Sequence, residues 1–349
     1  MLASPRVSQA QAEDIAREYY GVSGTAERLA AEHDDVFRLT MAAGTSLLIK
    51  VGAADPVTAE TSFQTAVLRH LAQAAPDLPV QRVIPALDGR AELTLDKWLK
   101  PTSDGAGDNA AARRLVRMTT YLDGRPLGWA PASAALRREI GGTLARLNHA
   151  LRSFSHPAAN RTHLWDLQNF PRLRPLLDQL PGTGQRPGLL ECFDRFDAVV
   201  RPRLPGARTQ VIHTDFHGDN LLVDDQATTV TGILDFGDSL AGPVAMDVAV
   251  AACYQFGGSP DPLKPSLEVV AGYHAADPLD DGDLPLIGEF MLARLAARII
   301  VSQWNAARDP GNKDYLLRRT PQAVEHFGLL RAIPAGVIGK RLAASLEKS

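Results

Sequence analysis

The ten residues VIHTDFHGDN, at positions 211–220, bring two histidines, two aspartates and an asparagine directly before the apolar run LLV. An isolated carboxylate is costly to bury, so these side chains require a cation, a charged ligand or an exposed turn. A second β-rich run, TVTGIL, follows LLV and ends in DFGD at residues 235–238. The two runs predict a hairpin that returns Asp235 to the side of Asn220.

The order Asp215, Asn220, Asp235 is the one used for phosphoryl transfer by enzymes of the protein-kinase architecture. We expect Asp215 to orient the acceptor hydroxyl and to take its proton. Asn220 and Asp235 are expected to hold Mg²⁺, a hard cation that takes oxygen ligands and completes its shell with water and phosphate. A DFG triplet alone is a weak signal, whereas the full set on one loop and one hairpin is specific.

A lysine in an apolar strand strengthens this interpretation. Lys50 ends the run TSLLIKV, where a charged side chain needs a partner. Phosphate oxygens and a carboxylate from the following helix would supply one, and Glu60 is the only acidic residue between Asp55 and Asp77. We therefore expect Lys50 and Glu60 to contribute to nucleotide binding. The alternative is an exposed lysine on an edge strand.

Hydrophobic periodicity predicts a strand-rich first third and a mainly helical remainder. Helices are expected at residues 8–21 and 56–76, strands at 34–41, 45–51, 80–87, 91–96 and 114–122, and a polar loop at 100–111. This order indicates an α+β protein with two lobes. A small β-rich N-lobe, residues 1–122, would carry a five-stranded antiparallel sheet and bind nucleotide. A larger helical C-lobe, residues 123–349, would carry the catalytic loop, the metal loop and the substrate-binding helices.

Composition narrows the alternatives further. Charged residues make up 22% of the 349-residue chain and the net charge is −3, so there is no basic footprint for nucleic acid. The two cysteines lie in apolar surroundings and cannot form a disulfide framework. We find no signal peptide and no apolar run of the ~18 residues that a membrane span needs, so we expect a cytoplasmic protein without membrane partners.

Taken together, the motifs resemble the aminoglycoside phosphotransferase and choline kinase superfamily, and within it most closely the hydroxylysine kinase group. The similar stretches are RLVRMTTYLDGRPL, GTLARLNHALRSFSHPAANRTHLWDLQN, ILDFGDSLAGPVAMDVAVA and YLLRRT, and the resemblance extends from about Asp35 to Leu330. It implies a protein-kinase-like fold. One departure is that AEHDDVFRL stands where protein kinases carry a Gly-rich loop, with Gly44 the only glycine nearby.

Further residues are expected to support the catalytic loop, and for Asp247 this expectation comes from the resemblance. His213 would brace the loop by hydrogen bonds, and Asp247 would fix the loop's backbone from a helix start. Asp238 would face the substrate or assist with the metal. His217 is open between bracing the loop and touching substrate, and Asp219 could cap the loop.

The nucleotide base would lie against the strand end that leads out of the N-lobe, residues 118–122. Met118, Tyr121 and Leu122 are the expected contacts, largely through backbone groups, so side chains reveal little about the choice of base.

The resemblance implies a kinase that transfers the γ-phosphate of ATP or GTP to a hydroxyl of a small, amine-bearing metabolite such as a hydroxylysine-like amino alcohol. Alternative acceptors are an aminoglycoside or other antibiotic, homoserine or choline, and a catalytically inactive nucleotide-binding protein is a third possibility. The helices after Pro260 should form the acceptor pocket, with Glu289, Arg294, Arg298 and Trp304 as candidate lining residues. The sequence gives no oligomeric state.

Overall fold

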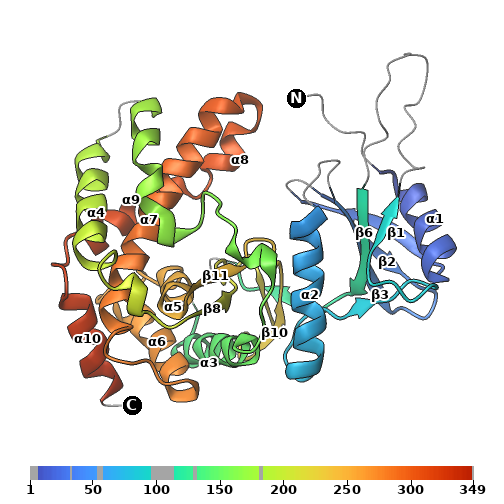
Figure 1. Ribbon diagram of the computed structural model, residues 1–349, viewed down its shortest axis with the longest axis horizontal. Helices are drawn as coiled ribbons and strands as arrows, with labels where there is room; N and C mark the ends of the chain where they lie inside the picture. The colour runs from blue at the N-terminus through green and yellow to red at the C-terminus, as the bar shows by residue number, and fades with distance from the viewer. Residues whose placement is uncertain are drawn as a thin grey trace. The chain divides into compact units, whose positions relative to one another are not determined.

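The computed structural model describes residues 7–31, 34–52, 58–95, 114–128, 132–180 and 184–347, except for the side chains of residues 58–61. The chain divides into two compact units, Met1–Asp123 and Gly124–Ser349 (Figure 1). The first contains an antiparallel sheet and the second is mainly helical, so the predicted α+β class is confirmed. The expected polar loop at residues 100–111 lies outside the described residues.

The described part of the first unit forms one six-stranded antiparallel sheet in the order β1-β2-β3-β6-β4, with β5 also paired to β6. The strands are β1 (Thr25–Leu29), β2 (Asp35–Thr40), β3 (Ser46–Val51), β4 (Val83–Ile84), β5 (Leu93–Leu95) and β6 (Arg114–Thr120). The expected count of five strands is therefore wrong. The missed strand, β1, is an edge strand of sequence TAERL in which only Ala26 is buried, so it carries no apolar alternation.

One face of this sheet packs against helix α1 (Gln9–Tyr20). Alternate residues of β2 and β3, such as Phe37 and Ile49, are buried together with Ile15 of the helix. A capping box between Ser8 and Gln11 begins the helix. Helix α2 (Thr58–Ala74) lies on the opposite side of the sheet from α1 in Figure 1 and contacts β4 and β6. The sheet is thus covered by a helix on each face.

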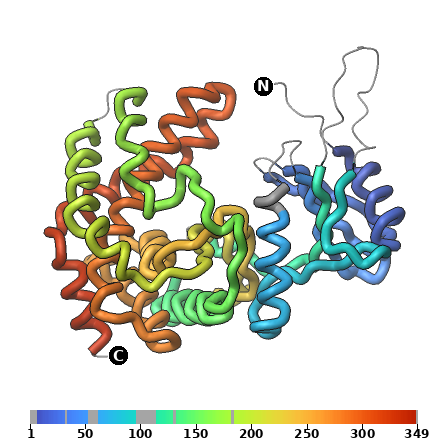
Figure 2. Tube along the Cα trace, in the orientation of Figure 1, coloured from blue at the N-terminus to red at the C-terminus, as the bar shows by residue number. Residues whose placement is uncertain are grey.

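The second unit is organised around one long helix, α7 (Leu284–Arg308), which contacts α4, α5, α9 and α10. Figure 2 follows the backbone of the last two, in orange to red, alongside α7. The other described helices are α3 (Ala134–Leu151), α4 (Arg186–Val199), α5 (Val244–Cys253), α6 (Lys264–Ala276), α8 (Lys313–Leu317), α9 (Thr320–Arg331) and α10 (Val337–Leu346). Among the described residues of this unit, 3₁₀ segments lie at Pro157–Asn160, Leu167–Gln179, Leu204–Gly206 and Pro310–Asn312. In the described part of the chain, none of these helices has the length and apolar character to cross a bilayer.

Helices α3 and α6 approach each other closely because glycines occupy the crossing. A Cβ atom on Gly141 would lie 2.0 Å from the backbone oxygen of Val269, and one on Gly272 would lie 2.1 Å from that of Arg138. Any side chain at either glycine would force the helices apart.

Two nested pairs of β-strands position the polar loops of the second unit. The inner pair joins β9 (Leu221–Val223) to β10 (Val230–Ile233), and the outer pair joins β8 (Thr209–Ile212) to β11 (Leu240–Pro243). The short β7 (Arg125–Pro126) adds to β9. Because the outer pair encloses the inner one along the chain, the β8–β9 loop and the β10–β11 loop lie side by side. These two loops carry the polar residues singled out in the sequence.

Candidate active site

The first loop, residues 213–220, is fixed at its start by a buried carboxylate. Asp247, in the first turn of α5, accepts hydrogen bonds from the backbone N–H of His213 at 3.2 Å and of Thr214 at 2.7 Å. Thr214 has a left-handed φ of 67°, which a threonine adopts only when its surroundings impose it. Burial raises the pKa of Asp247, while His213 and the two backbone donors act in the opposite direction.

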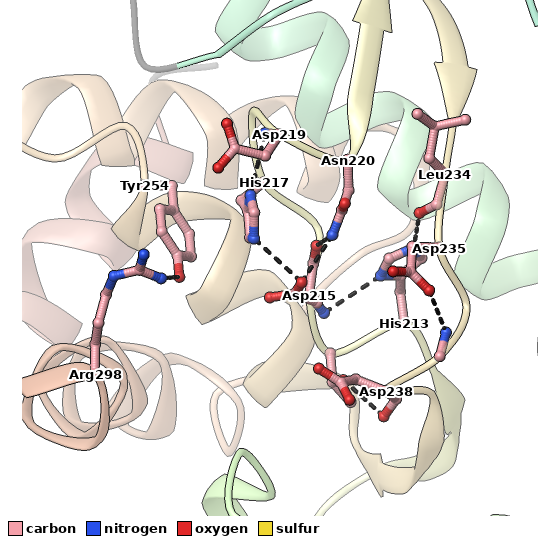
Figure 3. A network of polar contacts seen from close by, with 12 residues as sticks. His213, Asp215, His217, Asp219, Asn220, Leu234, Asp235, Asp238, Tyr254 and Arg298 are labelled. Atoms are coloured by element: carbon pink, nitrogen blue, oxygen red, sulfur yellow. Dashed lines mark hydrogen bonds and ion pairs between the residues drawn. The ribbon is translucent and has the colours of Figure 1, made fainter. Parts of the chain in front are cut away.

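His213 joins the two loops. Its Nδ1 accepts a hydrogen bond from the backbone N–H of Asp215 at 3.3 Å, so its Nε2 carries the proton that is donated to the backbone oxygen of Leu234 at 3.0 Å (Figure 3). The ring is fully buried and packs edge-on against Phe216. These contacts place His213 between the two loops, and its bracing role stays a prediction.

Asp215 projects from the middle of the loop and is held on both carboxylate oxygens. Its Oδ2 accepts from Asn220 Nδ2 at 2.7 Å and lies 3.1 Å from His217 Nε2, while Arg294 Nη2 lies 2.5 Å from Oδ1. Burial alone would raise the pKa of Asp215, but His217 and Arg294 hold it well below its usual range. Asp215 is therefore a fixed carboxylate at neutral pH.

Asn220 and Asp235 lie on adjacent loops, since the backbone N–H of Leu234 donates to the backbone oxygen of Asn220 at 2.9 Å. The side-chain nitrogen of Asn220 donates to the backbone oxygen and to the Oδ2 of Asp215. The side-chain oxygen of Asn220 therefore faces away from Asp215. Asp235 is exposed and has a left-handed φ of 57°. One of its oxygens accepts from the Gly237 N–H at 2.9 Å.

This donor set fits a hard divalent cation. One exposed carboxylate, from Asp235, and one amide oxygen, from Asn220, are the few ligands that Mg²⁺ takes from a protein when phosphates supply the rest. The described residues contain no cluster of three or more His, Cys, Asp or Glu side chains able to hold a metal by themselves. A cation at this place would accordingly depend on a phosphate-bearing ligand.

The second loop, residues 234–239, is clamped through its backbone oxygens by a segment far away in sequence. Arg161 donates to Gly237 and to Ser239, the latter at 2.8 Å, and His163 Nε2 lies 3.1 Å from the Asp238 oxygen. The same Asp238 oxygen accepts from the Thr214 hydroxyl at 2.9 Å. Burial, followed by the charge of Asp215, raises the pKa of the Asp238 carboxyl, and His163 opposes this shift.

Arg161 and His163 are residues to which sequence reasoning gave no role. Both residues lie in the segment HPAANRTHLWDL, which resembles the family. That resemblance does not show which parts of the chain the two side chains contact. Tyr254 was also missed, because it follows α5 in an apolar context. Its ring lies 4.6 Å from that of His217, centre to centre, and its hydroxyl accepts from Arg294 at 3.0 Å.

The candidate nucleotide residues belong to the first unit. Lys50 Nζ lies 2.9 Å from Asp34 Oδ2, and the described structure therefore pairs the lysine with a carboxylate from the residue just before β2. The expected partner, Glu60, lies in α2 with its side chain outside the described residues.

Met118 lies in the middle of the sheet of the first unit. Its side chain is fully buried in the core beside α1, and its ladder partners are Ile49 on one side and Ile84 on the other. The alternation of β6 turns this side chain to the core, and the contact predicted between the Met118 backbone and the base stays a prediction. Tyr121 and Leu122 follow the strand and are half-buried, and the Tyr121 ring lies 4.5 Å from the Arg38 guanidinium carbon.

Of the four candidate acceptor residues, one contacts Asp215 and a second shares a hydrogen-bond partner with the first. Arg294 contacts it directly, and Arg298 Nη1 lies 3.1 Å from the Tyr254 hydroxyl that Arg294 also contacts. Glu289 instead forms a buried ion pair with Arg195 at 2.8 Å. Trp304 donates to Gln179 at 3.0 Å.

The fold and the paired loops define a class of protein: small-molecule phosphotransferases of protein-kinase-like fold. The chain belongs to the Phosphotransferase enzyme family, abbreviated APH, whose profile matches residues 25–290. It is accordingly a phosphotransferase, and the family resemblance predicted from the motifs is confirmed.

Individual relatives agree with this assignment. Hydroxylysine kinase of Danio rerio is 24% identical over 356 residues, an alignment that covers 99% of this chain and 98% of that protein. A microcompartment-associated aminopropanol kinase shares the fold with a TM-score of 0.67 at 19% identity, covering 97% of this chain and 99% of the other. Amicoumacin kinase in complex with AMP-PNP, Ca²⁺ and Ami has a TM-score of 0.64 at 15% identity, covering 91% and 94%.

Proposed function

We propose that this small-molecule kinase transfers the γ-phosphate of ATP or GTP to a hydroxyl group of a small, amine-bearing metabolite of the hydroxylysine type. The observation that carries the proposal is the geometry of Asp215, which Asn220 and His217 hold on one oxygen beside the loop that presents Asp235. Two relatives support the acceptor class, since hydroxylysine kinase and aminopropanol kinase are both named for amino alcohols.

In the proposed reaction the acceptor oxygen forms a bond to the γ-phosphorus as the bond between that phosphorus and the bridging oxygen of the nucleoside diphosphate breaks. Asp215 orients the hydroxyl and receives its proton. Because the transition state is loose, position matters more than basicity, and a carboxylate of low pKa suffices. Asn220 and Asp235 would hold Mg²⁺, which neutralises charge on the phosphates when it is bound.

The nucleotide contacts are proposed from the first unit. Lys50 would donate to phosphate oxygens, with Asp34 or Glu60 as its carboxylate partner, and Tyr121 and Leu122 would offer groups to the base. An amicoumacin kinase of the same fold, which binds AMP-PNP and Ca²⁺, supports the use of a nucleotide with a divalent cation.

A nucleotide-consumption screen tests the proposal. The purified chain would be incubated with Mg²⁺ and either ATP or GTP against 5-hydroxylysine, ethanolamine, choline, homoserine and several aminoglycosides. Consumption that depends on one amino alcohol, with a phosphorylated product seen by mass spectrometry, is the expected result. Consumption only with an aminoglycoside would move the assignment to antibiotic phosphotransferase. Nucleotide binding without turnover on any acceptor would favour the inactive alternative, which the presence of Lys50, Asp215, Asn220 and Asp235 argues against.

A further inference from the structure

Two arginines of α7 reach the catalytic loop from the side of Tyr254. Arg294 and Arg298 are four residues apart and so lie on one face of the helix. Both donate to the Tyr254 hydroxyl, at 3.1 Å from Arg294 Nε and 3.1 Å from Arg298 Nη1. Figure 3 shows Tyr254 between Arg298 and His217, with Asp215 beyond the histidine. The tyrosine therefore fixes both guanidinium groups relative to the reacting carboxylate.

The same three residues line a small pocket within the second unit. It encloses about 280 Å³, including space open to solvent, and its other polar lining residues are Gln322 and His326. None of the described residues that line it is acidic. Much of this space is open to solvent, so the pocket suits one small group of a ligand rather than a whole metabolite.

Arg294 and Arg298, which line this pocket, both carry positive charge. Arg319 lies close enough to Arg298 and Arg318 that the two positive neighbours add to burial in lowering its pKa, although Asp219 opposes the shift. Arg294 is 3% exposed, and its Nη1 donor has no hydrogen-bond acceptor among the described residues. The charge of Arg294 is already paired with Asp215, whereas its Nη1 donor would be satisfied by a further acceptor, such as a ligand oxygen.

We propose that Arg298 and the Nη1 of Arg294 form an anion subsite that binds a carboxylate of the acceptor. The acceptor is then a hydroxy acid, such as a hydroxyl-bearing amino acid, rather than a purely cationic amino alcohol. This inference rests on the proposed function, because it places the carboxylate on Arg294, which also pairs with Asp215, while the hydroxyl of the same molecule reaches Asp215. A planar guanidinium matches a carboxylate with two parallel hydrogen bonds, which fixes orientation as well as affinity.

Matched acceptor pairs that differ only by the carboxylate test the subsite. Homoserine pairs with 3-aminopropan-1-ol, and 5-hydroxylysine pairs with 1,5-diaminopentan-2-ol. We expect kcat/KM to be roughly 10- to 100-fold higher for the acid of the accepted pair, as for one charged hydrogen-bonded contact. Arg298→Gln should reduce that preference about tenfold, mainly through a higher KM for the acid, with a smaller change for the decarboxylated member. Arg298→Lys should restore part of it, and Arg308→Gln, an exposed arginine on the same helix, should behave as wild type.

The outcomes separate the subsite from the function on which it rests. Equal use of both members of an accepted pair, or an undiminished preference in Arg298→Gln, would overturn the subsite while the kinase assignment stands. Absence of turnover on every hydroxyl acceptor would overturn the proposed function instead. The subsite is then tested by calorimetric titration with L-lysine and cadaverine, which share a skeleton and differ by the carboxylate. Binding of L-lysine that Arg298→Gln removes supports the subsite, and no binding of L-lysine to the wild-type chain refutes it.

Discussion

Arg294 and Asp215 form an ion pair at 2.5 Å, with the arginine 3% and the aspartate 19% exposed. The pair joins the centre of the longest helix of the second unit to the middle of the β8–β9 loop. Because Arg294 also stacks on the Trp165 ring, at 4.9 Å from its centre, the guanidinium has little freedom to leave. Asp215 is consequently oriented by the helical core as well as by its own loop.

Replacement of the central carboxylate should separate chemistry from binding. Asp215→Ala is expected to lower kcat by about 10²–10⁴-fold, since the hydroxyl loses its orienting acceptor, while nucleotide affinity changes little. Turnover would be measured by product formation and nucleotide binding by calorimetry. The variant Asp225→Asn, an exposed carboxylate on the β9–β10 turn, is the matched control. Near-normal turnover of Asp215→Ala would remove this residue from the reaction.

The role proposed for Asp235 as a metal ligand can be tested by titration with Mg²⁺. Asp235→Asn keeps the size of the side chain and removes its charge, so Mg²⁺-dependent nucleotide binding should weaken by roughly tenfold or more. The readout is the Mg²⁺ concentration at half-maximal nucleotide binding, compared with wild type. If the midpoint does not move, Asp235 is not a ligand.

The clamp on the second loop predicts an effect at a distance from the ligands. Arg161→Gln would leave the Gly237 and Ser239 carbonyls without their donor, so the loop that presents Asp235 should become less well positioned. We expect a higher half-maximal Mg²⁺ concentration and a lower kcat. Arg174→Gln, which removes an exposed ion pair with Asp194, serves as the control. A loss of thermal stability with unchanged Mg²⁺ dependence would show that Arg161 is only structural.

A buried carboxylate in the first unit predicts pH-dependent stability. Asp35 accepts from the Val7 N–H, Arg28 and Arg114, and these partners lower its pKa although burial opposes them. Because the folded pKa lies below the unfolded one, this stabilisation is complete above the unfolded pKa and is lost as pH falls from about 4. Asp35→Asn should therefore reduce the free energy of unfolding by about 3–5 kcal/mol at pH 7.

Urea unfolding of wild type and Asp35→Asn at pH 7 and at steps below pH 4 measures this contribution. The difference between the two proteins should narrow as the pH falls. Asp88→Asn, which removes a fully exposed pair with Arg90, should unfold like wild type. A difference that is constant with pH would mean that Asp35 is not the titrating group.

Local signals predicted much of the fold. Ser8 and Gly21 mark both ends of α1, and the alternation in β2 and β3 places their apolar residues on the face that packs against it. The inner hairpin, β9–β10, was also visible because its two runs are separated by a short polar turn. The outer pair, β8–β11, was not, since nothing in either run specifies a partner about thirty residues away (compare Thr209 with Pro243).

In the candidate site, too, local sequence signals predicted some residues, whereas contacts between distant segments could not be predicted. Asp215, Asn220 and Asp235 could be proposed because their chemistry and order are specific. The contacts of Arg161 and Tyr254 depend on tertiary packing, which residue type alone does not reveal. Lys50 shows that sequence alone does not identify the partner of a charged side chain. A helical glutamate was the expected partner, whereas the described contact is with Asp34, a residue next to the neighbouring strand.

The left-handed backbone at Thr214 and Asp235 has a consequence for the evolution of this chain. Both φ values, 67° and 57°, are ones that glycine adopts without strain. Glycine at either position would relieve local strain, yet it would remove the hydroxyl that holds the second loop or the carboxylate proposed for the cation. Changes that relieve strain and changes that preserve these contacts are therefore expected to oppose each other at both positions, in evolution as in engineering.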